Sequence, residues 1–173
     1  HIIRPEVSDF SIKGSISKIW GHRPSYYFLE GKEVNRSNSG GSPFITAMQG
    51  DFMNKFSAGT LTAGAKLTFR SNSQYHEFYS KENDQWIYSE YFSKDLLHTE
   101  LVPAAYLMFS SKAGKRFSYK AGFRGEFSTV TLSSVHEDLH MRNNSFFLAP
   151  SLSGTYRISD MNEIAAAFSR RTG

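Results

Sequence analysis

The stretch FSYKAGFRGEFST, residues 117–129, places an aromatic, alanine or glycine residue at each odd position up to 127 and a polar residue or glycine at each even one. Successive side chains of a β-strand point to opposite faces, so this alternation predicts a strand with one apolar and one polar face. The run is about twice as long as the ~5–6-residue strand that is typical of a soluble sheet. Residues 117–129 therefore predict a long amphipathic strand.

The same alternation recurs along the chain, for example in residues 10–17, 60–70 and 146–158. From these runs we expect strands near 7–20, 25–34, 43–55, 60–71, 86–109, 117–129, 145–158 and 162–171. The stretch 86–109 is long for one strand, and a break is expected near Lys94-Asp95. The fold class predicted is all-β: an antiparallel up-and-down meander of about eight long strands.

The expected connections alternate between short and long. Short joints fall at 21–24, 56–59, 110–116 and 159–161, whereas long polar loops fall at 35–42, 72–85 and 130–144. An up-and-down barrel has its short turns at one rim and its long loops at the other. The pattern favours part or all of a β-barrel, although periodicity alone does not tell whether the apolar face meets a protein core or lipid.

Composition limits the function classes. The chain has 173 residues, including 15 Phe and 9 Tyr, with no Cys and a net charge of +4. Without cysteine there is no disulfide, Cys-based zinc site, iron–sulfur cluster or thiol nucleophile. The basic residues are scattered, so we expect no nucleic-acid partner. No Gly-x-Ser-x-Gly elbow or phosphate-binding loop occurs, and we expect neither enzyme activity nor a cofactor.

One motif indicates a different function, that of a zinc enzyme. His136-Glu137-Asp138-Leu139-His140 is a literal H-E-x-x-H, which on a helix holds zinc in metallopeptidases. Ser134 has the spacing of a helix cap, and Glu163 lies downstream where a third ligand is found in some of these enzymes. Asn143 and Asn144 end any helix after about two turns. The favoured interpretation is a polar loop in which His136 and His140 are weak metal-ligand candidates, and a zinc peptidase is a minor alternative.

Two sets of side chains have predicted places on the barrel. Residues of the polar face that we expect to line a lumen are Lys66, Arg70, Lys120, Arg124, Glu126 and Arg157. Aromatic residues near the expected strand ends, which suit an interfacial girdle, are Tyr26, Tyr27, Trp86, Tyr88, Tyr91 and Phe92.

Several segments resemble one family. Four segments are similar, in chain order, to barrel segments of TonB-dependent outer-membrane receptors of Bacteroidota: LTAGAKL (61–67), LVPAAYLMFSSKAGKRFSYKAGFRGEF (101–127), LAPSLSGTYRISD (148–160) and FSRR (168–171). The first 40 residues match that family only in style. The plug domain and the TonB box that such receptors contain are not found in this sequence.

The resemblance implies that residues 1–173 are a single barrel segment, a fragment of a larger receptor in the outer membrane of a Gram-negative bacterium. The parent would import a nutrient that the sequence does not name. Implied partners are outer-membrane lipid, the plug domain, a TonB-type energy-transducing protein and a surface lipoprotein. An isolated segment is expected to self-associate through its open edges.

The resemblance also places residues 130–144 in an extracellular loop and Glu163 at the opposite rim, roughly 25 Å away. That separation disfavours the zinc peptidase. A soluble β-domain, or a complete small barrel, that binds a small ligand stays as the alternative function.

Overall fold

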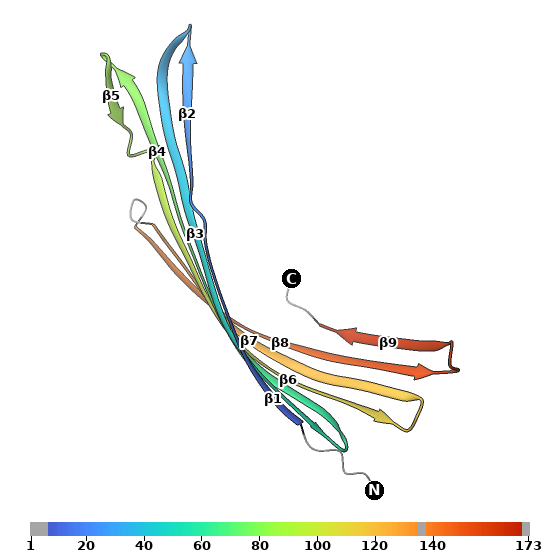
Figure 1. Ribbon diagram of the computed structural model, residues 1–173. Coiled ribbons are helices and arrows are strands. Elements are labelled where there is room, and N and C mark those ends of the chain that lie inside the picture. The colour runs from blue at the N-terminus through green and yellow to red at the C-terminus, as the bar shows by residue number, and fades with distance from the viewer. Residues whose placement is uncertain (1–6, 135–137, 171–173) are drawn as a thin grey trace.

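The computed structural model describes residues 7–134 and 138–170, and in these residues the chain forms one antiparallel sheet of nine strands (Figure 1). Their bounds are β1 Val7–Lys18, β2 Gly21–Leu29, β3 Lys32–Phe56, β4 Gly59–Glu82, β5 Gln85–Tyr88, β6 Lys94–Ala113, β7 Phe117–Ser134, β8 Leu139–Arg157 and β9 Glu163–Ser169. No helix of the described residues is long and apolar enough to cross a membrane.

The strands follow one another across the sheet in the order β1-β3-β4-β6-β7-β8-β9, with β2 beside β3 and β5 beside β4. Every pairing is antiparallel, and apart from the short strands β2 and β5 each strand pairs with the next one along the chain. The predicted all-β, antiparallel meander is confirmed. The expected break near Lys94-Asp95 is also confirmed, because β5 ends at Tyr88 and β6 begins at Lys94.

The expected turn at Gly21–Pro24 is wrong. β1 and β2 run in the same direction along one edge of β3, and the chain between them does not reverse. Ile19 donates its N–H to the Pro43 carbonyl at 3.0 Å, which keeps the chain beside β3 across the break. Gly and Pro were read as turn residues, but a proline is also tolerated in an edge strand such as β2, where one side of the backbone needs no partner.

The polar stretches 35–42 and 72–85, predicted as loops, are mostly strand. They belong to β3 and β4, which continue to tight turns at Glu30-Gly31 and Asn83-Asp84. All four turn residues have positive φ, as a two-residue hairpin turn of the I′ type requires. Residues 130–134 and 139–144, in the third predicted loop, likewise extend β7 and β8. In the extensions of β3 and β4, polar residues lie on both faces, so the alternation that marks a strand disappears from the sequence there.

The registers give the sheet one apolar and one polar face. A row across six strands joins Phe10, Phe52, Ala63, Leu107, Phe123 and Pro150. The next position along each strand faces the other way, and there a row joins Ser11, Asp51, Gly64, Tyr106, Arg124 and Ala149. The alternation read from residues 117–129 therefore also holds on the five strands that share these rows with β7.

The apolar face has no protein layer packed against it. Ala104 is the one buried apolar residue among those described, and large side chains such as Phe123 and Phe146 stay 54% and 69% exposed. An exposed apolar surface of this extent requires a partner or an apolar solvent. A core of the kind that stabilises a soluble domain is absent from the described residues.

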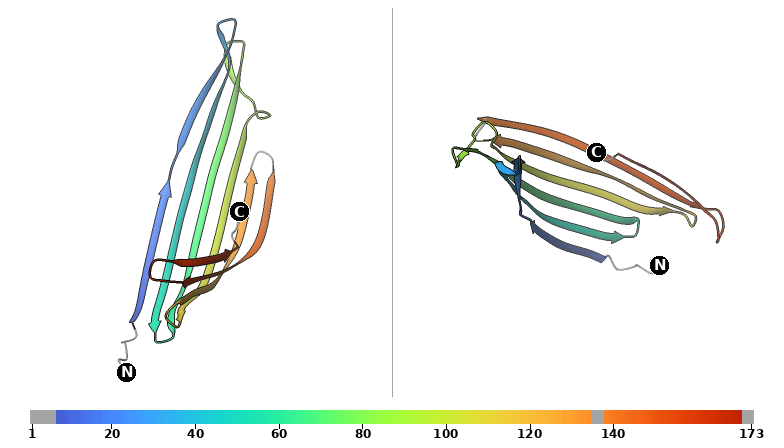
Figure 2. Two further views of the ribbon diagram at one scale, coloured as in Figure 1. Left: turned by 90° about the vertical axis from the view of Figure 1, so that its right-hand side faces the viewer. Right: turned by 90° about the horizontal axis from the view of Figure 1, so that it is seen from above.

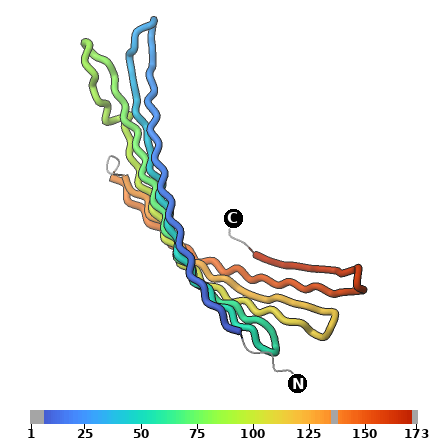
Figure 3. Tube along the Cα trace, in the orientation of Figure 1, coloured from blue at the N-terminus to red at the C-terminus, as the bar shows by residue number. Residues whose placement is uncertain are grey.

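The sheet bends into an open arc (Figure 2). Two hollows, of about 1350 Å³ and 690 Å³, are lined mainly by residues of the polar face, such as Thr60, Lys120 and Arg124, so the polar side is the concave one. β1 and β9 lie at opposite edges and are not paired with each other in the described part of the chain (Figure 3).

Leu107 and Met108 are adjacent on β6 and point to opposite faces, which makes them a matched pair for testing the apolar face. Leu107→Arg is expected to lower the free energy of unfolding by about 2–4 kcal/mol in lipid vesicles, because it puts a charge into the apolar band. Met108→Arg faces the concave polar side and is expected to cost less than about 1 kcal/mol. Urea titrations of both variants in phosphatidylcholine vesicles give the comparison, and equal costs would contradict the assignment of faces.

Candidate functional site

The concave polar face is the candidate functional surface. The structure places all six predicted lumen residues on it: Lys66 and Arg70 on β4, Lys120, Arg124 and Glu126 on β7, and Arg157 on β8. They do not form one cluster but are spread along the strands. Whether this face lines a lumen stays a prediction.

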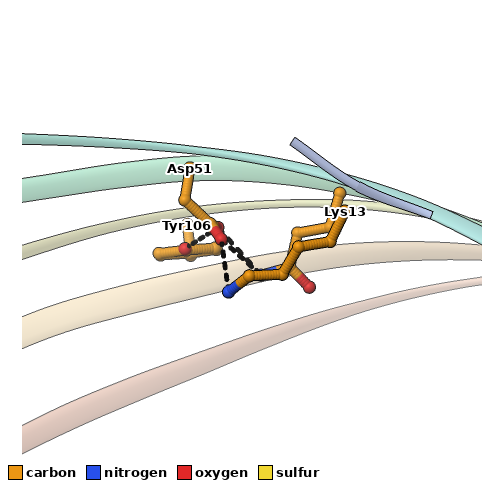
Figure 4. Close-up of polar contacts among 4 residues, drawn as sticks. Lys13, Asp51 and Tyr106 are labelled. Atoms are coloured by element: carbon orange, nitrogen blue, oxygen red, sulfur yellow. Dashed lines mark hydrogen bonds and ion pairs between the residues drawn. The ribbon is translucent and has the colours of Figure 1, made fainter. Parts of the chain in front are cut away.

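The centre of the polar face is organised by Asp51 of β3 (Figure 4). Tyr106 of β6 donates its hydroxyl hydrogen to Oδ1 of Asp51, and Nε2 of Gln49 lies 2.8 Å and 3.1 Å from the two carboxylate oxygens. On the other side, Nζ of Lys13 on the edge strand β1 lies 3.5 Å from Oδ2. One carboxylate thus connects three strands.

Gly64 makes this connection across β4 possible. It lies directly between Asp51 and Tyr106 in the register, and a Cβ built at Gly64 would be 2.6 Å from the Tyr106 ring. The tyrosine ring therefore lies flat over the glycine and reaches the carboxylate two strands away. A side chain at position 64 would push the ring off the sheet.

Two of the predicted cations are neutralised nearby. Arg70 pairs with Glu100 of β6 at 2.5 Å, and Ser128 also donates a hydrogen bond to Glu100 at 3.2 Å. Arg124 forms an ion pair with Glu126 on its own strand. Each contact joins side chains of one face, as the register requires.

Asp51, Tyr106 and Glu100 were not among the predicted site residues. Continuing the alternation along each strand would have placed these three residues on the polar face. Asp51 lies on the same face as Gln49 of β3, and Glu100 and Tyr106 lie on the same face as Ala104 of β6. Their partners lie on other strands, and only the register brings them together.

The predicted zinc motif gains no support from the geometry. His136 and Glu137 lie outside the described residues, but Leu139 and His140 begin strand β8 rather than a helix. Glu163 pairs with Arg157, at the far end of β8 from His140, and at ~3.3 Å per residue the strand between them is roughly 55 Å long. Glu163 is therefore not the third ligand, and the described residues contain no cluster of three or more potential metal ligands.

The residues of the predicted aromatic girdle lie beyond the apolar band. Tyr26 pairs with Arg36 and Tyr79 pairs with Tyr88, about eight positions beyond Phe44, so these rings lie on the polar extension of the sheet. There the Arg36 guanidinium stacks over Trp86 at 4.2 Å. Burial raises the pKa of Tyr79, and the neighbouring Glu77 carboxylate raises it further.

Other aromatic residues border the apolar band instead. Toward the long extensions these are Trp20, Phe44 and Phe69; toward the opposite rim they are Phe56, Phe109, Phe117, Tyr119 and Tyr156. Phe44 and Phe69 contact each other at 6.3 Å between ring centres, and Phe109 and Tyr119 at 6.1 Å. Aromatic belts at both borders of an apolar band are typical of transmembrane barrels.

These features define a class of protein. A single curved sheet with long tilted strands, an uncharged apolar outer band, aromatic borders and a charged concave face is the wall of a membrane β-barrel of the outer-membrane type. The sequence matches the outer membrane protein beta-barrel family over residues 8–173, and the chain belongs to that family. Its location is the outer membrane, which overturns the soluble alternative. No curated protein matches the chain.

Gly64→Ala is expected to destabilise the protein by about 1–3 kcal/mol, because its Cβ displaces Tyr106 and leaves Asp51 without its phenolic partner. Gly50→Ala is the control: no atom lies within 4 Å of a Cβ built there, so stability is expected to stay within about 0.5 kcal/mol of the original. Urea unfolding measures both. If Gly64→Ala costs as much in a Tyr106→Ala background, the ring is not what the glycine accommodates.

We expect the purified protein to contain less than one zinc ion per chain, and His136→Ala to leave its metal content unchanged. The reason is that a His pair without a third ligand binds zinc weakly. Mass spectrometry of the metal content after dialysis tests this. Stoichiometric zinc that is lost in His136→Ala would restore the metal-site hypothesis.

Proposed function

We propose that this chain forms part of the barrel wall of a TonB-dependent receptor that imports a nutrient across the outer membrane, in a bacterium of the Bacteroidota. In this proposal the chain has no catalytic role and no cofactor. It supplies wall, lumen lining and the projections on one side of the membrane.

The observation that carries the proposal is the open edge on each side of the sheet. β1 and β2 at one edge, and β9 at the other, have backbone groups that no described strand pairs with. In lipid, every backbone N–H and C=O must find a partner within protein, so barrels close. The wall is therefore completed by further strands, which supports a barrel wider than these strands alone would make.

The segments that resemble the receptor family are also neighbours in the sheet. Residues 101–127 form most of the hairpin of β6 and β7, and residues 148–160 lead through β8 to the turn before β9. These are adjacent strands and short turns at the same rim. A resemblance that falls on contiguous wall elements supports a shared architecture more strongly than scattered matches do.

In the proposed receptor the charged concave face lines the path of the nutrient. The expected partners are outer-membrane lipid, a plug domain within the barrel, a TonB-type energy-transducing protein and a surface lipoprotein. The strand extensions beyond the apolar band, which end at the β2–β3 and β4–β5 turns, project furthest from the membrane (Figure 1).

Growth on a limiting nutrient tests the proposal. A strain that lacks the gene for the full protein is compared with its parent on single iron, cofactor and glycan sources, and uptake of the source that separates them is measured with a radiolabel. Import by a TonB-dependent receptor requires the inner-membrane proton gradient, so a protonophore is expected to abolish uptake. Uptake that continues at the same rate with the protonophore would show a passive pore and sink the proposal.

A further inference from the structure

The larger hollow lies at the end of the concave face where the short turns are. It has a volume of about 1350 Å³, and its walls come from β3, β4, β6, β7 and β8 around the Ser57-Ala58 turn. Hydroxyl groups line much of it, from Thr60, Ser110, Ser118, Ser153 and Thr155. Its described lining contains three lysines, Lys55, Lys112 and Lys120, and no acidic residue.

These lysines differ from the cations nearer the middle of the wall. Lys13, Arg70 and Arg124 each have a carboxylate partner. Lys55, Lys112 and Lys120 form no ion pair with any described residue, and the nearest acid by register on this face, Asp9, is not joined to Lys55. Lys66, nearer the middle, also has no ion pair with a described residue, but it stands alone, whereas the hollow brings three such lysines together.

The register spaces the three ammonium groups unevenly. Lys112 pairs with Ser118, two residues before Lys120, so the two lysines are diagonal neighbours at roughly 7–8 Å between their Cα atoms. Lys55 lies in the same row as Lys120, three strands away, which is roughly 14 Å at ~4.8 Å per strand. Two lysines can therefore hold one anionic group together, and the third can hold a second group on the other side.

We propose that this hollow is a binding site for an elongated solute that carries carboxylate or phosphate groups at both ends. Lys112 and Lys120 bind one end, Lys55 binds the other, and the hydroxyl groups between them hydrogen-bond to the middle. A wall of one charge sign around a concave surface attracts such an anion over several ångströms. This inference rests on the proposed function, which places the hollow on the path of the nutrient.

The test measures binding and needs no transport. The binding proposal can therefore fail while the proposed transport function holds, and the transport function can fail while the binding proposal holds. The full-length protein that contains this wall is folded in zwitterionic dodecylphosphocholine micelles, and its β-sheet content is checked by circular dichroism. Isothermal titration is then run with three probes: inorganic phosphate, linear tetraphosphate and a blocked tetraglutamate peptide.

Two triple variants remove the same charge from different places. Lys55→Gln, Lys112→Gln and Lys120→Gln together empty the hollow of cations. Lys18→Gln, Lys32→Gln and Lys81→Gln together remove three lysines near the opposite ends of the strands, outside the hollow. All six side chains lie on exposed surfaces, so both variants are expected to fold.

Tetraphosphate is expected to bind the original protein at least about tenfold more tightly than phosphate, because it reaches both groups of lysines. The first triple variant should lose this difference and the second should keep it. Raising the salt concentration from about 0.05 M to 0.5 M should weaken the binding.

Three results would overturn the proposal. One is equal affinity for phosphate and tetraphosphate, which would mean that the lysines act singly. Another is an equal effect of the two triple variants, which would mean that net charge alone is responsible. The third is tight binding of the peptide without binding of tetraphosphate, which would assign the hollow to an acidic polypeptide segment instead of a solute.

Discussion

The structure depends on one constraint: a single antiparallel sheet must satisfy its backbone within the sheet while its apolar face has no protein to pack against. Ala104 is the only buried apolar residue among those described, so stability does not come from a central core. It comes from the backbone ladders between neighbouring strands and from lipid around side chains such as Phe123 and Phe146. The length of the strands, the aromatic borders and the absence of charge in the band all follow from this constraint.

The polar face is stabilised differently, by side chains that reach across strands. Tyr106 crosses the bare backbone of Gly64 to reach Asp51. A similar contact occurs on the opposite face of the extension, where Tyr75 lies over Gly40 and hydrogen-bonds to His22 at 3.0 Å. In both places a glycine lies on the strand between the two interacting residues, and the tyrosine ring lies across that strand. These contacts tie the edge strands β1 and β2 to the centre of the sheet, whereas the lysines of the hollow at one end have no carboxylate partner among the described residues.

How much could be predicted varied with the surroundings of each element. The strands at residues 117–129 and 60–70 are predicted correctly because one face of each meets an apolar medium and the other meets water. Apolar and polar residues therefore alternate along the sequence. The prediction of loops at 35–42 and 72–85 failed for most of these residues because polar side chains lie on both faces of β3 and β4 there. The turn predicted at Gly21–Pro24 is part of strand β2, because an edge strand tolerates a proline that a central strand would not. Glu100 and Asp51 were missed because their roles depend on partners in other strands.

The sequence by itself determined the strand type, the identity of the two faces and the sorting of charges away from the apolar band, because each follows from alternation along one strand. Only the tertiary structure decided which residues meet. The pairing of Arg70 with Glu100, the separation of Glu163 from His140 and the gathering of Lys55 with Lys112 and Lys120 all depend on strand register. Register joins residues far apart in the chain, and no local pattern encodes it.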